Sequence, residues 1–534
     1  MTAWMKNMYK KGHSCLFIKH KQLTYWKQTP HDTAVGPAPS TWLPRAPWAA
    51  VAVALLLAGC SMAPPYQRPV LEVPATFKQA TPAAADQGIW QPARYGAQAG
   101  PDAAIPSTLP AAWWTLYGDP TLDQLQAQAA AHNPSVEQAV ARLRAAQAAV
   151  ASSQAGLYPT LGLSGSSSRA RSGSSNSGST NAGINNSYSL GLNASWELDL
   201  WGRLSNQVAA DQLSAQASRD DLAAARLSSQ ATVAQTYFSL RAAEAQMQLL
   251  QDSLQAYQQS WQLTQNRYRA GVASSADVAQ AESQYKSTQA QWLEAQTTRA
   301  QFEHALAALL GLAPASFSLP MTSQLPAPPP VPGMLASTLL EQRPDIAAAE
   351  RRVAAANAQV GVARAAYFPA LTLSAAGGYR SSTLPHLLSA PNLFWSLGPA
   401  LAVALLDGGA RSAAVESARA SLDLAAATYK QTVLTALQEV EDNLVAATHL
   451  GQEQAVQAEA VAAARKALEV ATNQYKAGTV GYLNVLSAQT TVLNAQNSLI
   501  SVHNRRLAAT NTLLKNVAGR WDSPSAPPPA TAAQ

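Results

Sequence analysis

Hydrophobic and polar positions along this chain follow two different periods, and each period occurs twice. Over residues 188–200 the even positions are apolar and the odd positions are polar or small. This period of two is typical of a strand with one apolar face. A similar alternation covers 395–405. We expect each of these strands to pair with an earlier one, over about 160–171 and 370–380.

Helical periodicity fills most of the remaining sequence. Two very long stretches contain no proline: one runs from about 203 to 310, and the other from about 409 to 517. Each is interrupted by a glycine, Gly271 or Gly478, near which we expect the chain to turn. At about 1.5 Å per residue, the first arm alone approaches 100 Å. Arms of this length favour projecting coiled-coil hairpins over a globular core.

The two halves of the chain repeat one unit. Pro134 and Pro159 bracket a helix in the first half, and Pro344 and Pro369 bracket one in the second, at the same offset. Each half supplies a helix, two strands and a long helical hairpin. A duplication of this length is not a short-period solenoid. The sequence therefore predicts a mainly α-helical fold with four strands per chain.

Four strands cannot close a barrel by themselves. Unpaired backbone groups at an open sheet edge have no partner in lipid. If these strands cross a membrane, several chains must share one β-barrel. Three chains would supply twelve strands, an even number within the known range. A soluble, half-buried sheet would show the same alternation, so the pattern alone leaves that alternative open.

A short apolar run at 46–59 follows Arg45. It is too short to span a bilayer and ends in small residues, as a cleaved secretory signal does. The alternative is a buried apolar helix. The segment before this run is unusually long for a signal. We therefore expect the true translation start to lie downstream, at an alternative initiator such as Val35 or Leu43.

The run Leu57-Ala58-Gly59-Cys60 resembles a bacterial lipobox. It predicts a mature chain that begins at Cys60 and carries a covalent lipid there, an N-acyl group and an S-diacylglycerol. The alternative is a buried free thiol. The one other cysteine is Cys15, in the leader, so the mature chain has no disulfide.

Charge and chemistry-bearing residues argue against a nucleic-acid partner and against catalysis. Charged residues are 13% of the chain, against about 25% on average. The net charge of +6 belongs to residues 1–59, which hold seven Lys or Arg and one acidic residue. The eight His are scattered, and the sequence shows neither a Cys/His cluster with metal-ligand spacing nor a Gly-Lys-Ser phosphate loop. We expect no enzyme and no metal cofactor.

These observations divide the chain into six parts. They are a signal peptide at 1–59, a lipidated tether at 60–112, a first repeat at 113–312, a Pro-rich linker at 313–333, a second repeat at 334–521, and a disordered tail at 522–534.

Several short motifs, in this order, resemble the TolC-like outer-membrane factor family, specifically its lipidated branch of NodT-type efflux lipoproteins. The resemblance covers about 60–521. Its carriers are Cys60 followed by Pro65-Tyr66-Gln67-Arg68-Pro69; Trp113-Trp114 with Gly118-Asp119-Pro120; Asn133-Pro134; Trp196-Glu197-Leu198-Asp199-Leu200-Trp201-Gly202-Arg203; Arg343-Pro344-Asp345-Ile346; and Tyr475-Lys476-Ala477-Gly478-Thr479 with Tyr482-Leu483-Asn484-Val485-Leu486.

The resemblance implies a homotrimer with a shared twelve-stranded outer-membrane barrel and a periplasmic helical tunnel. Such a trimer is the exit duct of a tripartite efflux system. Its partners are a periplasmic adaptor and an inner-membrane transporter, commonly of the resistance-nodulation-division type. The duct passes small molecules without reacting with them. Two alternatives stay open: a duct for type I protein secretion, and a lipid-anchored periplasmic coiled-coil scaffold without a pore.

The resemblance also implies a gate at the periplasmic tip. By motif, Leu483 would form a constricting apolar ring. Relatives often carry Asp at the positions of Asn484 and Ser487, so this chain lacks those acidic rings. Asp277 is the remaining acid near the tip, and the alternative for it is a solvated helix-start residue.

The hairpin turns are the candidate adaptor contacts. They are marked by Tyr268 and Gly271 in the first half and by Tyr475 and Gly478 in the second. The plainer alternative is that the tyrosines pack and the glycines only turn the chain.

Overall fold

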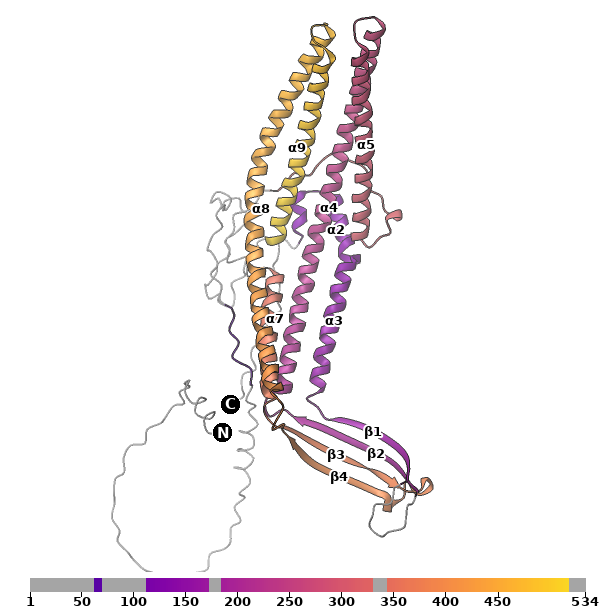
Figure 1. The fold of residues 1–534 in the computed structure, drawn as a ribbon, viewed down its shortest axis with the longest axis vertical. Helices are drawn as coiled ribbons and strands as arrows, with labels where there is room; N and C mark the ends of the chain where they lie inside the picture. Colours follow the sequence, from indigo (N-terminus) through magenta and orange to yellow (C-terminus); the bar gives the residue numbers. More distant parts are fainter. Residues whose placement is uncertain (1–61, 70–111, 172–183, 330–342, 518–534) are drawn as a thin grey trace, which may run out of the picture. The chain divides into compact units, whose positions relative to one another are not determined.

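The computed structural model describes residues 62–69, 112–171, 184–329 and 343–517 (Figure 1). All of them belong to one compact unit, residues 59–534. The predicted signal peptide, the predicted lipidation site Cys60 and the predicted disordered tail at 522–534 lie outside the described residues.

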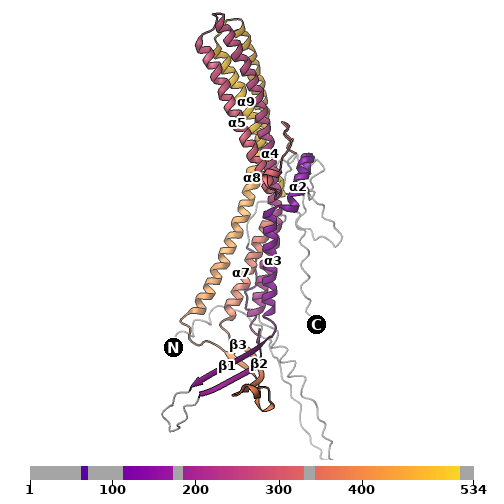
Figure 2. The same cartoon turned by 90° about the vertical axis from the view of Figure 1, so that its right-hand side faces the viewer.

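The order of elements repeats, as the sequence predicts (Figures 1 and 2). In the first half these are α2 (Pro120–His132), α3 (Pro134–Ala155), β1 (Thr160–Arg171), β2 (Ile184–Leu198), α4 (Arg203–Arg269) and α5 (Ser275–Leu309). In the second half they are α7 (Pro344–Ala365), β3 (Ala370–Ser381), β4 (Leu393–Ala402), α8 (Ala410–Lys476) and α9 (Tyr482–Val517). A short 3₁₀ turn, Trp113–Tyr117, precedes α2, and others lie between the later elements.

Local chemistry fixes where the helices begin. The side chain of Asn133 caps α3 by accepting hydrogen bonds from the amides of Ser135 (2.9 Å) and Val136 (3.3 Å). Its amide group also donates to the carbonyl of Leu309 at 2.7 Å, which ties the start of α3 to the end of α5. The long helices α4 and α8 each follow a glycine with positive φ, Gly202 and Gly409, at the corner where a strand becomes a helix.

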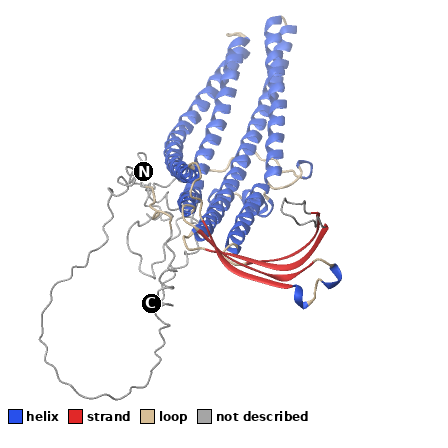
Figure 3. Cartoon of the chain, turned by 60° about the horizontal axis from the view of Figure 1, so that its bottom comes forward, coloured by secondary structure: helices blue, strands red, loops and turns tan. Residues whose placement is uncertain are grey.

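The four strands form one antiparallel sheet (Figure 3). Their order is β1-β2-β3-β4, so β1 and β4 are the edges. The predicted bounds of two strands were wrong at both ends: β2 spans 184–198 and not 188–200, and β4 spans 393–402 and not 395–405. The strand β2 already begins at Ile184, because residues 184–187 pair with the end of β1. The strand β4 ends at Ala402 and does not continue to Leu405, because Ala402 pairs with Ala370, the first residue of β3.

The sheet has one apolar face and one face of polar and small residues. The register places on the first face Leu161, Leu163, Gly165, Leu190, Leu192, Ala194, Trp196, Leu371, Leu373, Ala375, Gly377, Tyr379, Leu393, Trp395, Leu397, Pro399 and Leu401. On the other face, polar side chains bond across strands: Asn193 donates to the Ser164 hydroxyl at 2.7 Å, and the Ser166 and Ser189 hydroxyls lie 2.8 Å apart. Most leucines of the apolar face are exposed, Leu161 at 72% and Leu397 at 66% among them, whereas Leu371 and Leu373 are half-buried.

The helices bury their own cores. One cluster joins the 3₁₀ turn, α2, α4, α5 and α9 around Trp113, Tyr237 and Leu306, all at most 1% exposed. A second joins α7, α8 and α9 around Ile346 and Val433. The first includes Leu507 and Leu514 of α9, and therefore the two halves share a core. No helix within the described ranges combines the length and apolarity needed to cross a membrane.

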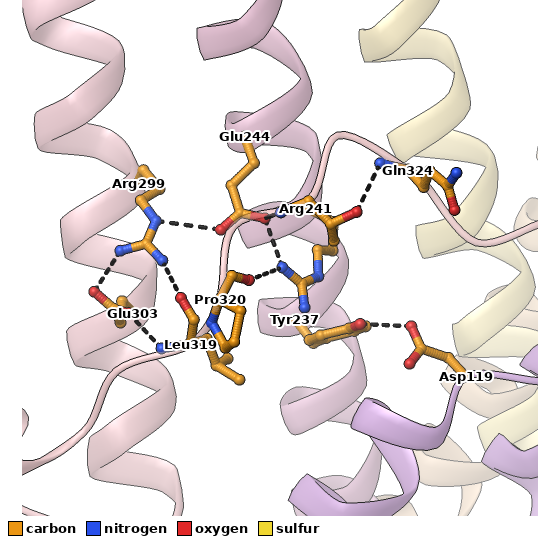
Figure 4. A network of polar contacts seen from close by, with 10 residues as sticks. Asp119, Tyr237, Arg241, Glu244, Arg299, Glu303, Leu319, Pro320 and Gln324 are labelled. Carbon is orange, nitrogen blue, oxygen red and sulfur yellow. Dashed lines mark hydrogen bonds and ion pairs between the residues drawn. The ribbon is translucent and has the colours of Figure 1, made fainter.

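A buried network of charges fastens the segment after α5 to α4 and α5 (Figure 4). Glu244 accepts hydrogen bonds from Arg241 (2.6 Å) and Arg299 (3.2 Å), and Arg299 also donates to Glu303 at 2.6 Å. The two arginines donate to the carbonyls of Pro320 (2.9 Å) and Leu319 (2.8 Å). The side chains of Glu244 and Arg241 are 1% and 4% exposed. Two positive and two negative charges thus hold the connecting segment in place.

Residues 62–69 lie along α7. The carbonyl of Pro64 accepts from the Asn357 amide at 2.8 Å, and Arg68 forms an ion pair with Glu350 at 3.1 Å. A Cβ at Gly361 would lie 2.8–2.9 Å from Ala63. Gly361 therefore allows this segment to approach the helix.

We expect Gly361→Ala to loosen this contact. Added volume at a tight contact costs about 1–3 kcal/mol, so the backbone amides of 62–68 should exchange hydrogen about tenfold faster or more. Hydrogen–deuterium exchange with mass spectrometry would measure this. The matched control is Gly451→Ala, also in a helix, where the new Cβ would meet the flexible Arg506 side chain at 3.7 Å. Equal exchange in both variants would contradict the prediction.

Candidate functional site

The two hairpin turns have the same backbone geometry. Gly271 and Gly478 both have φ of 77°, the left-handed conformation that glycine adopts without strain. In each turn, the amide after the glycine bonds to the carbonyl five residues earlier: Val272 to Arg267 at 2.9 Å, and Thr479 to Gln474 at 3.0 Å. This pattern closes a helix with a Schellman motif. The duplication therefore extends to individual hydrogen bonds.

The tyrosines of the two turns have different environments. Tyr268 is 50% exposed, whereas Tyr475 is 4% exposed. Tyr475 packs edge-on against Tyr482 at 5.6 Å between ring centroids and bonds to the hydroxyl of Thr264 at 3.3 Å. Tyr475 thus packs between the hairpins, and Tyr268 remains available at the surface.

Several side chains of α4, in the first hairpin, contact the second hairpin near the tip. The guanidinium of Arg267 lies 4.7 Å from the Tyr475 ring centroid, a cation–π distance, and donates to the Lys476 carbonyl at 3.2 Å. Farther from the turn, the Ser260 hydroxyl donates a hydrogen bond to the Tyr482 hydroxyl (3.4 Å), and the Tyr257 hydroxyl donates one to the Gln489 carbonyl (3.2 Å). Burial raises the pKa of Tyr257 and of Tyr482, which keeps both hydroxyls neutral.

The sequence reasoning missed Arg267 and the residues Tyr257, Ser260 and Thr264 as contacts of the second hairpin. Arg267 precedes Tyr268 in the turn motif, but its partners lie about 210 residues later. No local pattern in the sequence indicates such a pairing.

The carboxylate of Asp277 is engaged in the cap of α5. It accepts hydrogen bonds from the amide and the hydroxyl of Ser274, both at 2.9 Å, while the Ser274 hydroxyl accepts from the Asp277 amide at 3.1 Å. This reciprocal pair is a capping box. The helix-start alternative accounts for the contacts of Asp277, and a role in binding cations remains a prediction.

Leu483, Asn484 and Ser487 are exposed on one face of the first turns of α9. Tyr482 and Val485, which are 0% and 2% exposed, are buried on the opposite side. These two anchors determine how α9 is rotated and therefore which residues face outward. Leu483 is 62% exposed, and α9 contains no charged residue between its start and His503. The result is an uncharged strip with a leucine near its end.

Metal ligands do not gather in the described part of the chain: no group of three or more His, Cys, Asp or Glu is placed to hold an ion there. The tips, at the end of the helices opposite the sheet (Figure 1), are instead defined by packing and turn geometry.

Comparisons with known proteins agree with this architecture. The family model for outer membrane efflux proteins matches the chain twice, over residues 125–312 and 335–519. The solvent efflux pump outer membrane protein SrpC of Pseudomonas putida is 33% identical over 475 residues, 88% of this chain and 97% of that protein. The cation efflux system protein CusC of Escherichia coli is 30% identical over 473 residues, which cover 88% and 97%.

A solved structure supports the same assignment. The open state of the MtrE outer membrane channel of Neisseria gonorrhoeae matches with a TM-score of 0.71 and 28% identity, over 86% of this chain and 98% of that one. The resemblance expected from the sequence motifs is thus confirmed for the family. The chain belongs to the outer membrane efflux protein family.

Proposed function

We propose that this protein is the outer-membrane exit duct of a tripartite efflux system, which passively conducts small molecules from an inner-membrane pump and a periplasmic adaptor to the exterior. One observation carries the proposal. A four-stranded sheet with an exposed apolar face and two open edges continues into helices that are 67 residues long.

The sheet supports a shared barrel. Its leucine-rich face matches the lipid side of a membrane strand, and its Ser- and Asn-rich face matches a water-filled interior. The edges β1 and β4 need partners, because lipid offers none to unpaired backbone groups. Three copies joined edge to edge would give twelve strands, so we propose a homotrimer.

The helices support a tunnel on the periplasmic side of the barrel. We propose that Leu483 forms its constriction, and that the uncharged Asn484 and Ser487 line the tip without the acidic rings that the family resemblance implies at these positions. The exposed turns at Gly271 and Gly478, with Tyr268, are the proposed adaptor contacts. We propose an inner-membrane partner of the resistance-nodulation-division type.

Relatives favour small-molecule cargo. SrpC belongs to a solvent efflux pump and CusC to a cation efflux system. The family and these relatives are efflux proteins, and we propose that the duct does not react with its cargo. The scaffold alternative gives no reason for a sheet with an apolar face and two open edges. The alternative of type I protein secretion keeps the same duct and differs from small-molecule efflux in its cargo, so a transport experiment must separate the two.

We also propose that Cys60 carries the lipid. As residue numbers fall from Arg68 to Ala63, the contacts on α7 move from Glu350 to Gly361, toward the sheet. The three residues from Ala63 to Cys60 span at most about 10 Å. A lipid at Cys60 would thus be within reach of the same membrane. Mass spectrometry of the mature amino terminus, with Cys60→Ser as the control, tests this.

Single-channel recording in planar bilayers tests the duct. The purified, detergent-solubilised protein is expected to run as a trimer and to give small or flickering currents from a closed resting tip. A trimer that inserts but never conducts, or a protein that does not assemble, would contradict the duct. Transport of a small dye, but not of an unfolded protein, by cells that also express an adaptor and a pump would separate efflux from protein secretion.

A further inference from the structure

Charged residues are distributed unevenly along the sheet. The four strands contain three arginines and one acidic residue. The acid, Glu197, lies at the helix end of the sheet and is paired with Arg203 at 2.7 Å. The arginines Arg169, Arg171 and Arg380 all lie at the opposite end, toward the strand connections. That end therefore carries positive charge only.

Arg169 and Arg171 belong to the apolar face. Side chains alternate along a strand, so both lie on the same side as Leu161 and Leu163 of β1. The partners on β2 give the same assignment. Leu163 pairs with Leu192, and Arg169 pairs with Asn186, which lies two residues from Tyr188 and therefore on the same face as Tyr188 and Leu192. Both arginines are exposed.

The two arginines lie just beyond the apolar band of this face. The last leucine row joins Gly165, Leu190, Tyr379 and Leu393. Arg169 is four residues further along β1 than Gly165, about 13 Å along the strand, or about 10 Å along the membrane normal at the usual strand tilt. Between them lies the row of Tyr188, an aromatic residue of the kind that favours a membrane interface. This height corresponds to lipid headgroups rather than hydrocarbon.

Within the described ranges, no acidic side chain pairs with these arginines. The sequence has no acidic residue from Thr160 to Ser195 or from Ala370 to Leu406. A second copy placed against the β1 edge would bring only the same acid-free strands. Arg380 differs, because it lies on the other face, with its guanidinium 5.1 Å from the Phe394 ring centroid.

We propose that Arg169 and Arg171 bind the phosphate groups of lipid headgroups in the outer leaflet of the outer membrane. Guanidinium groups bind phosphate with two parallel hydrogen bonds, and the two side chains lie on one face, about 7 Å apart along β1. The inference rests on the proposed function, which places the apolar face in that membrane. The contact sets the height of the barrel and selects phosphorylated lipid around it.

Native mass spectrometry of the full detergent-solubilised protein, titrated with lipid A, tests the proposal. Wild type is expected to bind lipid A with two phosphates about tenfold more tightly than dephosphorylated lipid A. The variant Arg169→Gln/Arg171→Gln should reduce this ratio to less than twofold. Arg380→Gln, which removes the same charge from the other face, should keep the wild-type ratio.

Three outcomes would overturn the proposal. They are an unchanged ratio in the double variant, an equal loss in Arg380→Gln, and full competition by inorganic phosphate at the concentration of the lipid, which would indicate a site for free phosphate. Single-channel recordings on the same preparations separate this inference from the duct. Normal conductance without phosphate selectivity removes only the lipid contact, whereas absent wild-type conductance contradicts the duct itself.

Discussion

Replacing Glu244 with alanine is expected to lower the free energy of unfolding by about 3–5 kcal/mol, the usual cost of removing one partner of a buried ion pair. Glu244 is the acceptor that joins Arg241 to Arg299, and it also accepts from the Thr322 amide at 3.1 Å. The variant would leave Arg241, with a side chain 4% exposed, without its carboxylate partner. Guanidinium unfolding followed by far-ultraviolet circular dichroism would measure the loss.

The matched control is Glu453→Ala. Glu453 pairs with Arg505 at 2.7 Å, but the two side chains are 48% and 53% exposed. Exposed pairs contribute about 0–1 kcal/mol, so this variant should unfold nearly as wild type does. Glu244→Gln, which keeps the shape but not the charge, should fall between the two. A loss below about 1 kcal/mol in Glu244→Ala would mean that water or a rearranged neighbour compensates Arg241 and Arg299.

The network also explains how the segment after α5 is held. Leu319 both accepts from Arg299 (2.8 Å) and donates its amide to Glu303 (2.8 Å). Arg241 stacks on Tyr237, whose hydroxyl donates to Asp119 before α2. Burial and this hydrogen bond raise the pKa of Tyr237 to about 12. One chain of polar contacts therefore connects the start of α2, the middle of α4, α5 and the segment after α5, although these parts are distant in sequence.

The fold could be predicted from the sequence because its signals are local and occur twice. The alternation at 188–200 identifies the two faces of the sheet by itself. Prolines at 134 and 344 begin helices at their first turn in both halves. The proline-free arms define α4 and α8, and the glycines 271 and 478 define the turns. Each of these signals depends only on residues that are close together in the sequence.

The charge network could not be predicted, because its members resemble ordinary surface pairs. Arg241 and Glu244 are three residues apart, and Arg299 and Glu303 are four apart, which are the spacings of solvated pairs on a helix. What buries them is the segment at 319–322, and no local pattern indicates where that segment lies.

The repeat was also misleading at the tip. It places Tyr268 and Tyr475 in the same position of the turn motif, three residues before Gly271 and Gly478, yet the structure exposes the first tyrosine and buries the second. The difference arises because Tyr475 faces the other hairpin, at Thr264 and Arg267. A duplicated sequence predicts the duplicated backbone, but contacts between the halves break the symmetry.

We expect Leu483→Ala to increase the single-channel conductance severalfold and to reduce current flicker. Tyr482 and Val485 are buried and hold α9 so that Leu483 faces outward, 62% exposed in one chain. In a trimer, three such leucines would form an apolar ring, and a narrow apolar ring opposes the passage of hydrated ions. Alanine removes most of that side chain. Because Leu483 lies outside the buried core, the trimer should remain as stable as wild type.

The control for this effect is Leu424→Ala, an equal truncation of a leucine that is 69% exposed on α8, far from the turn. It should leave the conductance unchanged. Conductance that rises in both variants would indicate a general loosening of the helices. A large wild-type conductance that Leu483→Ala does not alter would preserve the duct and exclude Leu483 as its constriction. In that case the contacts of Arg267 with Tyr475 and Lys476, which join the hairpins at the same level, become the next candidates for what keeps the tip closed.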